Sequence, residues 1–458
     1  MPIVFLLHTI LPNGRVRNAV LIIASLLFYA YGEPVAIILL LLSILCNYLF
    51  GCLMTGKHKK FWLVVAVIGN IGMLFVFKYA PAILSGRGLK ELTGPVPDAV
   101  RNLALPVGIS FYTFQALSYV IDVYRGEVQA QKNFFRLLLY VSFFPQLIAG
   151  PIVKYHDIEK EISDRQVTVD GVWSGLLRFS AGLGKKVLIA NTMAYIADTI
   201  YAFPNSYIGV LSAWTAAAAY LMQIYFDFSG YSDMAIGLGR MFGFHFQENF
   251  DYPYVSGSIR EFWRRWHISL STWFRDYLYI PLGGNRRGKQ RTIFNKFVVF
   301  FCTGVWHGAN WTFLVWGMFH GILEMLEEKR WIPVHKGWKV LNHVYTLLAV
   351  TVGFVIFRAE SLQQAFYVIK SMFGFGSNYS VGYTKTLALL SPYTVFVFLC
   401  AVIGCTPLMK KALLKLHAAE HGKAVAEYAA MLFALAILVL SFMALAADSY
   451  NPFIYFRF

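Results

Sequence analysis

Two histidines lie inside one strongly apolar stretch of the chain. His307 is followed by Gly308, and His320 is followed by Gly321. An ionisable side chain at membrane depth is costly to bury, so it is a hypothesis for a functional site by default. A buried imidazole can act as a general base that takes the proton of an alcohol while the alcohol attacks an activated acyl group. The alternative is that each histidine is a hydrogen-bonded core residue.

The spacing of the two histidines limits how they can act together. Thirteen positions correspond to about 220° around a straight helix, so an unbroken helix would place the two rings on nearly opposite faces. They can face one cavity only if the helix breaks between them, and Gly308 with Asn310 supplies such a break. Without a break only one histidine faces the reaction. We then favour His307, because Gly304 and Gly308 allow a substrate or another backbone to approach it closely.

Other kinds of catalytic site find little support in the sequence. A zinc site needs three or four ligands, usually in close pairs, and neither HExxH nor paired cysteines occur. We therefore expect no metal site, and we interpret the cysteines as packing residues: Cys46, Cys52, Cys302, Cys400 and Cys405. The G-x-S-x-G elbow of hydrolases, the P-loop and the dinucleotide fingerprint are also absent.

The elements that must hold these histidines are predicted to be membrane helices. Of the 458 residues, 58% are hydrophobic and 14% are charged, against about 25% charged in soluble domains. Apolar runs long enough to cross a bilayer predict about ten to twelve membrane segments in an all-α, polytopic membrane protein. The runs lie near 18–31, 34–54, 61–80, 101–121, 134–152, 171–201, 207–226, 292–306, 311–326, 340–357, 387–406 and 425–447.

We expect a single membrane-embedded domain over residues 1–458. The run 134–152 contains Pro145, Gly150 and Pro151, which predict an interruption. Non-helical backbone at membrane depth must be buried in protein or line a cavity. No basic region precedes the first apolar run, so we expect no cleavable signal peptide.

The positive charge of the chain is concentrated between apolar runs. Lys and Arg number 40 and Asp and Glu 24, which gives a net charge of +16. Clusters within 57–60, 286–291 and 410–415 are placed on the cytoplasmic side by the excess of Lys and Arg typical of inner loops. No nucleic-acid-binding motif accompanies them, so we expect no nucleic-acid partner.

Residues 259–291 are too charged to span lipid and rich in aromatic side chains. We predict an amphipathic helix over Ile259–Leu278 at the cytoplasmic interface, then a turn over Pro281–Asn285 and a basic loop. Phosphates of a donor or an acidic carrier protein would arrive on this side and meet arginines. The candidate donor-binding residues are Arg264, Arg265, Arg275 and Arg286. The alternative is that they are ordinary positive-inside anchors.

Short motifs are spread over nearly the whole chain. They are, in order, Ala24–Ala30, Gly32–Pro34, Leu105–Gln115, Ile121–Arg125, Phe144–Pro151, Asp227–Asp233, Phe262–His267, Arg275–Arg286, Trp306–Gly308 and Pro452–Phe458. Together they resemble the membrane-bound O-acyltransferase family, and within it the bacterial alginate O-acetyltransferase type. The most specific motifs are Phe262–His267, Arg275–Arg286 and Trp306–Gly308.

This resemblance implies an α-helical fold around a central funnel or tunnel, with His307 as the key histidine and His320 as a secondary residue near the core. Family members of this type take acetyl from cytoplasmic acetyl-CoA and pass it across the bacterial inner membrane. An extracytoplasmic partner of the SGNH-hydrolase type then completes transfer to a polysaccharide. The resemblance thus implies a multi-pass protein of the cytoplasmic membrane, in contact with membrane lipids. Acetyl-CoA is expected as a substrate, with no permanently bound cofactor.

Three alternatives remain open at this stage. A related branch of the family transfers D-alanine from a carrier protein to teichoic acid, although the Gly283–Gly288 loop is more similar to the acetyl-transferring branch. A transporter could use the histidines as a proton relay without bond chemistry. A scaffold for an extracytoplasmic transferase would need no catalytic histidine at all.

Overall fold

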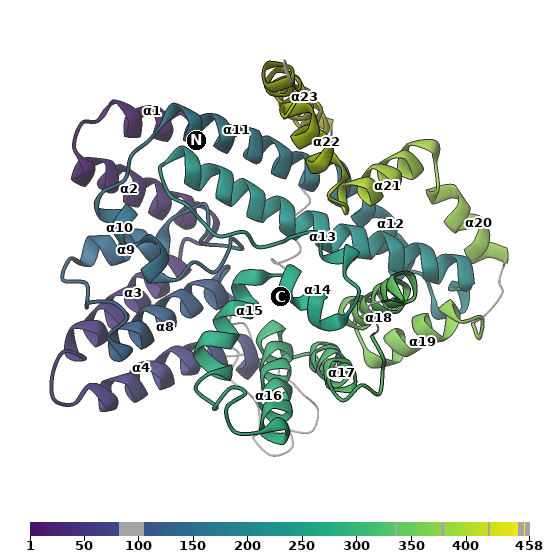
Figure 1. The fold of residues 1–458 in the computed structure, drawn as a ribbon, viewed down its shortest axis with the longest axis horizontal. Coiled ribbons are helices and arrows are strands. Elements are labelled where there is room, and N and C mark those ends of the chain that lie inside the picture. The colour runs from purple at the N-terminus through teal and green to yellow at the C-terminus, as the bar shows by residue number, and fades with distance from the viewer. Residues whose placement is uncertain (82–104, 335–336, 377–379, 420–421, 448–452, 454–458) are drawn as a thin grey trace. The chain divides into compact units, whose positions relative to one another are not determined.

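The computed structural model describes residues 1–81, 105–334, 337–376, 380–419, 422–447 and 453. Every regular element in these ranges is a helix, which confirms the all-α prediction (Figure 1). Internal contacts divide the chain into two compact units, and each is described by itself. Unit 1 comprises residues 1–179 and 235–248, and unit 2 comprises residues 180–234 and 249–458. This division into units does not test the expected single domain over residues 1–458, which stays a prediction.

Unit 1 is built around one helix that is almost wholly buried. This helix, α8, has the polar residues Gln115, Ser118 and Asp122 among its buried side chains and packs against α3, α4 and α9. The helices of this unit are α1 (Pro2–Ile10), α2 (Gly14–Gly32), α3 (Ala36–Leu53), α4 (Lys59–Leu74), η1 (Phe75–Tyr79), α8 (Ile109–Arg125), α9 (Phe134–Ser142), α10 (Tyr155–Ser163) and the first part of α11 (Val169–Gly184).

The predicted interruption of the run 134–152 is confirmed. The helix α9 ends at Ser142, and the following backbone is non-helical yet largely buried. Polar groups of this segment find partners inside the unit: the Phe144 N–H donates to Ser25 Oγ at 3.1 Å, and Gln146 Nε2 donates to the Tyr140 carbonyl at 2.7 Å. Buried backbone without helical hydrogen bonds is tolerated because such partners satisfy it.

Unit 2 contains the two histidines of the sequence prediction. Its helices are η2 (Lys185–Ala190), α12 (Asn191–Tyr201), η3 (Asn205–Tyr207), most of α13 (Val210–Met241), η4 (Pro253–Val255), α14 (Ile259–Arg265), α15 (Ile268–Phe274), η5 (Arg275–Tyr279), α16 (Lys289–His307), α17 (Trp311–Glu328), α18 (Lys339–Arg358), α19 (Leu362–Met372), α20 (Ser380–Leu389), α21 (Pro392–Gly404), α22 (Leu408–His417) and α23 (Gly422–Ala447). Its core is a cluster of aliphatic and aromatic side chains from α12 to α21.

The helices α16 and α17 form a closely packed hairpin, and glycines make the approach possible. A Cβ on Gly317 would lie 2.5 Å from the Phe300 carbonyl oxygen, and one on Gly304 would lie 2.7 Å from the Phe313 carbonyl oxygen. Any larger side chain at either position would force the two backbones apart. The two glycines therefore set the short distance between the backbones of α16 and α17.

The amphipathic helix predicted over Ile259–Leu278 is not continuous. The helix α14 begins at the cap Ser258 and ends at Arg265, and the chain resumes as α15 and the π-helical turn η5. His267 sits at the break with a left-handed φ of 45°. Asn249 stabilises the break, since its carbonyl accepts from the Ile268 N–H and its side chain accepts from Ser269. The predicted turn over Pro281–Asn285 is present.

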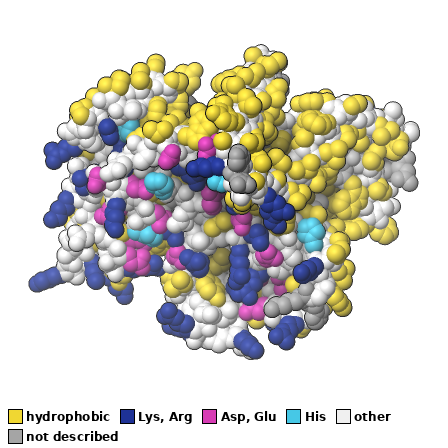
Figure 2. All heavy atoms as spheres, turned by 45° about the horizontal axis from the view of Figure 1, so that its top comes forward, with side chains coloured by type: hydrophobic (Ala, Val, Ile, Leu, Met, Phe, Trp, Pro, Cys, Tyr) yellow, Lys and Arg dark blue, Asp and Glu magenta, His cyan; other side chains and the backbone are white. Residues whose placement is uncertain are grey.

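Length and hydropathy identify four helices able to cross a membrane among the described residues, against ten to twelve predicted segments. They are α3, α4 with η1, α18 and α23, and the bent pair of α20 and α21 makes a fifth if it counts as one span. Other apolar runs form shorter helices, as in α9, or carry charged outer turns, as in α16 and α17. On the face drawn in Figure 2, hydrophobic side chains form broad exposed areas. The central funnel implied by the resemblance stays a prediction.

Candidate active site

His307 is the last residue of α16. The chain turns at Gly308, and Asn310 caps the start of α17 by accepting a hydrogen bond of 3.2 Å from the Thr312 N–H. The predicted helix break at Gly308 and Asn310 is therefore confirmed. Asparagine at this position satisfies one of the free N–H groups that begin a helix.

The break brings both histidines to one tryptophan. The Trp316 ring lies 5.0 Å from the His307 ring and 5.5 Å from the His320 ring, measured between centroids. Both imidazoles are buried, with 5% and 0% of their surfaces exposed. The two residues thus belong to one aromatic cluster, which a single straight helix would not allow.

Packing holds His320 in place. Its ring stacks on Phe262 and meets Trp263 edge to face at 5.4 Å. On the side of α18 it lies against Gly353, where a Cβ would be 2.6 Å from Nε2. Neither of its ring nitrogens has a hydrogen-bond partner among the described residues. An unpaired buried polar group is costly, so these two nitrogens are candidates to bind a water molecule or a ligand.

A third histidine joins the cluster, and the sequence analysis did not select it as a site residue. His267 lies 6.3 Å from Trp306, whose ring is 4.8 Å from His307. His267 is buried, and its Nδ1 is 3.1 Å from Asn249 Oδ1. A positive φ is uncommon for a residue other than glycine and gives a reason to consider the position as a functional site. The available signal was its place at the end of the specific motif Phe262–His267.

A basic pocket of about 600 Å³ opens beside this cluster in unit 2. Its walls come from α14, α15, η5 and α16, with one residue from α17. The lining residues are Arg260, Trp263, Arg264, Ile268, Leu270, Ser271, Thr272, Phe274, Arg275, Tyr279, Asn285, Lys296, Val299, Phe300, Thr303 and Glu324. Two of the four candidate arginines, Arg264 and Arg275, line it. His307 and His320 lie outside the lining.

The charges of the lining are mostly positive. Within the described ranges, neither Arg260 nor Arg264 has an ion pair, and both are exposed. The hydrogen bond of 2.7 Å to Asp276 raises the pKa of the Arg275 guanidinium above its ordinary value. Glu324 is the one carboxylate of the lining, and Lys296 neutralises it at 3.0 Å. Such a pocket suits a ligand that carries phosphate groups.

The other two candidate arginines lie outside the pocket lining. Arg265 pairs with Glu261 at 3.0 Å and with Asp251 at 3.2 Å. Arg286 is exposed in the turn that leads to α16. Although Arg264 and Arg265 are neighbours in sequence, only the first faces the pocket, because the helical rotation of about 100° per residue turns the second away.

The pocket and the histidine cluster share a wall. Lys296, Phe300 and Thr303 line the pocket from one face of α16, and His307 follows on the same face one turn after Thr303. From Lys296 to His307 this stripe extends about 17 Å along the helix axis. On the opposite wall, Trp263 lines the pocket and its ring lies 5.6 Å from that of Trp316. His307 therefore lies one helical turn beyond the pocket lining on α16, and His320 packs against the lining residue Trp263.

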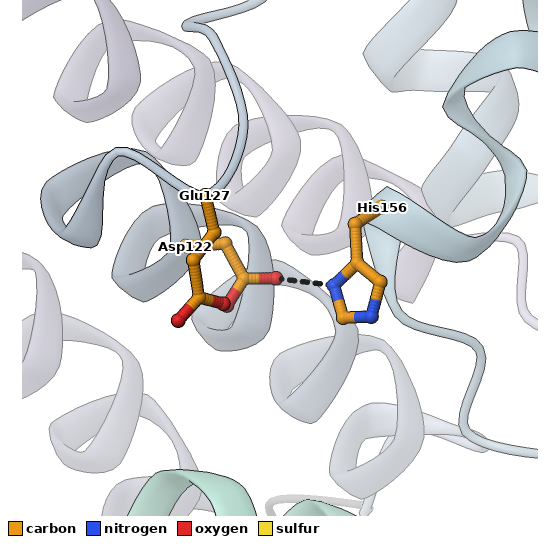
Figure 3. Close-up of side chains that lie close together, drawn as sticks. All are labelled: Asp122, Glu127 and His156. Atoms are coloured by element: carbon orange, nitrogen blue, oxygen red, sulfur yellow. Dashed lines mark hydrogen bonds and ion pairs between the residues drawn. The ribbon is translucent and has the colours of Figure 1, made fainter.

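Unit 1 contains a separate group of ionisable side chains, shown in Figure 3. Asp122, Glu127 and His156 offer three ligand-type atoms within 4.8 Å of one another. His156 Nδ1 is 3.0 Å from Asp122, and its Nε2 is 3.1 Å from Asp157. The imidazole is thus placed between two carboxylates and links α10 to α8. The absence of a metal site stays a prediction.

Comparison with known proteins now bears on the function. The model of the membrane-bound O-acyltransferase family matches residues 127–357. The probable alginate O-acetylase AlgI of Pseudomonas putida is 39% identical over 98% of this chain and 96% of its own length. The chain belongs to the membrane-bound O-acyltransferase family. It is therefore an enzyme and a membrane protein with several transmembrane helices, as the sequence predicted. The relatives that it matches are bacterial.

Two further relatives show how this acyltransferase is placed within the family. The probable alginate O-acetylase AlgI of Pseudomonas aeruginosa is 45% identical over 82% of this chain and 73% of its own length. The peptidoglycan O-acetyltransferase of Helicobacter pylori is 35% identical over 81% of this chain and 76% of its own length. The matched region 127–357 includes all three histidines and the basic pocket. Of the resembling motifs, Pro452–Phe458 lies outside the described residues except for Phe453.

Proposed function

We propose that this acyltransferase takes an acetyl group from cytoplasmic acetyl-CoA and passes it across the membrane for O-acetylation of a cell-envelope or secreted polysaccharide. The relatives named as acetylases support acetyl as the group transferred. A teichoic acid D-alanyltransferase of Bacillus subtilis is more distant, at 29% identity over 64% of this chain. Two acetylase relatives act on different polymers by name, so the acceptor is proposed only as a class.

The observation that carries the proposal is the stripe on α16 that joins the basic pocket to His307. Arg264 and Arg275 would bind the phosphates of CoA at the open end. The pantetheine arm would then run along Phe300 and Thr303 toward the buried histidine. We retain Arg265 and Arg286 as proposed donor-binding residues, which would act at the cytoplasmic approach to the pocket rather than in its lining.

In this proposal His307 is the general base. Its imidazole takes the proton of an acceptor hydroxyl while the hydroxyl oxygen forms a bond to the acetyl carbonyl carbon. The bond from that carbon to the CoA sulfur breaks, and the leaving thiolate takes the proton from the imidazolium. Trp306, Trp316 and Phe357 pack around the ring, which keeps water away from the thioester. His320 is proposed as a secondary residue that packs against the same Trp316 ring.

The acceptor hydroxyl must be reached from outside the cell. We propose an extracytoplasmic partner of the SGNH-hydrolase type that completes transfer to the polysaccharide. Membrane lipids surround the exposed apolar helices. No cofactor is proposed to remain bound between turnovers.

The test is transfer of radiolabelled acetyl by the purified protein in sealed vesicles, with acetyl-CoA supplied on one side. His307→Ala should abolish label transfer, while His343→Ala should leave it intact, because the His343 ring bonds to the Ser256 carbonyl and is not part of the histidine cluster. Transfer of D-alanine from an acylated carrier protein, with no use of acetyl-CoA, would overturn the acetyl donor and support the D-alanyl alternative. Equal rates for wild type and His307→Ala would overturn the assignment of the base.

A further inference from the structure

The helix α22 is exposed on every side. None of the ten residues from Leu408 to His417 is buried, and its large apolar side chains are between 37% and 61% exposed. Leu408 is 59% exposed and Leu414 is 61% exposed. In a soluble setting such a helix would place its leucines in water at a free-energy cost that nothing in the fold offsets.

The side chains of α22 are sorted by type around its axis. At about 100° per residue, an apolar arc of about 140° contains five residues, and a cationic arc of about 160° contains three lysines, one histidine and one leucine. The apolar arc consists of Leu408, Ala412, Leu416, Met409 and Leu413. The cationic arc consists of His417, Lys410, Leu414, Lys411 and Lys415. A basic amphipathic helix is typical of a membrane surface.

The neighbours of α22 place it at the end of two membrane helices. Three residues connect it to α21, which is half of the bent candidate span, and four connect it to the candidate span α23. Only 11% of the most apolar window of α23 is buried within the protein, so this helix faces lipid. At about 15 Å, α22 is too short to cross a hydrocarbon core of about 30 Å. It must therefore lie where the two neighbouring helices leave the bilayer.

We propose that α22 lies flat in the headgroup layer of the cytoplasmic leaflet and binds anionic lipid headgroups through Lys410, Lys411 and Lys415. Its apolar arc would enter the acyl-chain boundary, and the lysines would extend to the phosphates. Charge complementarity selects this occupant, because anionic headgroups attract lysines next to a membrane span and the helix carries no acidic side chain. The excess of Lys and Arg places the helix on the cytoplasmic side. The proposal is independent of which acyl group the enzyme transfers.

The depth of the helix can be measured on the full chain in lipid nanodiscs. A variant without the five native cysteines would receive a spin label at Leu413→Cys, in the apolar arc, or at Lys411→Cys, in the cationic arc. We expect the label at 413 to collide more with oxygen than with a water-soluble nickel chelate, and the label at 411 to show the reverse. The proposal would be overturned if both labels collided freely with the nickel chelate. It would also be overturned if both labels were shielded from oxygen and from the chelate by contact with protein.

Lipid selectivity is tested by a second variant that keeps the fold of the spans. Full-length protein in nanodiscs of mixed phosphatidylglycerol and phosphatidylcholine should bind phosphatidylglycerol in preference to phosphatidylcholine. In the triple variant Lys410→Gln, Lys411→Gln and Lys415→Gln, the ratio of bound phosphatidylglycerol to bound phosphatidylcholine should fall by about tenfold. The control removes the same charge elsewhere, with Lys57→Gln, Lys59→Gln and Lys60→Gln. Equal loss in both triples would show a general charge effect and overturn the assignment to α22.

Discussion

The imidazole of His307 meets the indole of Trp316 edge to face, with ring centroids 5.0 Å apart and planes at 88°. The same indole also packs against His320, with ring centroids 5.5 Å apart. Trp316 is 2% exposed and lies on α17, whereas His307 ends α16. The orientation of the proposed base therefore depends on a side chain from the second helix of the hairpin.

Replacement of Trp316 should impair catalysis more than donor binding. Trp316→Leu removes the surface that fixes the His307 ring, so we expect kcat to fall by about tenfold or more with little change in the KM for acetyl-CoA. The cost in stability should be about 3 kcal/mol. Trp311→Leu is the matched control, since Trp311 lies on the same helix but is 69% exposed. An unchanged kcat in a folded Trp316→Leu protein would contradict this role.

Replacement of Arg264 should weaken donor binding, whereas replacement of its neighbour Arg265 should mainly lower stability. Loss of a charged hydrogen bond to phosphate costs about 1.5–3 kcal/mol, so Arg264→Gln should raise the KM for acetyl-CoA by roughly tenfold. Acetyl-pantetheine, which lacks the nucleotide phosphates, should be used equally well by Arg264→Gln and wild type. Arg265→Gln should have a smaller effect on this KM and should instead destabilise the protein, because it breaks the pairs with Glu261 and Asp251. The same KM shift for both substrates would argue against phosphate binding by Arg264.

Glu327 anchors the pocket wall formed by α14. Its carboxylate accepts hydrogen bonds from the Ile259 N–H at 2.7 Å and from the Arg260 N–H at 3.3 Å, which satisfies the start of the helix. Glu327→Ala should raise the KM for acetyl-CoA several-fold and lower the free energy of unfolding by about 1–2 kcal/mol. Glu328→Ala provides a neighbouring control, since Glu328 pairs with Lys296 instead. A larger effect of Glu328→Ala on both quantities would refute the anchoring role.

Gly353 leaves the space that His320 occupies. A methyl group there would lie 2.6 Å from His320 Nε2, so Gly353→Ala must displace the imidazole or separate α18 from α17. We expect a loss of about 1–3 kcal/mol in stability and a lower rate of acetyl transfer. Gly337→Ala, where nothing lies within 4 Å of the added methyl, should leave both quantities near wild type. Normal activity in Gly353→Ala would show that the position of His320 is unimportant.

The parts of the site that sequence predicts are those with local causes. Gly308 and Asn310 carry their own signals for a helix end, so the break after His307 was predicted correctly. The break at His267 depends on hydrogen bonds that oxygen atoms of Asn249 accept, 18 positions earlier in the chain, and the local amphipathic pattern continues through it. Whether Arg264 or Arg265 faces the pocket depends on how α14 packs against α16 and α17, which no local pattern specifies. The number of membrane segments stays a prediction, because hydropathy does not reveal where buried helices are short or broken.

The most direct test of the central claim is the rate of acetyl transfer from acetyl-CoA by purified wild type and His307→Ala in sealed vesicles. The protein should first be shown to keep its thermal unfolding temperature and its binding of CoA. The account predicts loss of transfer by about 10²-fold or more with CoA binding retained. Transfer at the wild-type rate by a folded His307→Ala protein would contradict it.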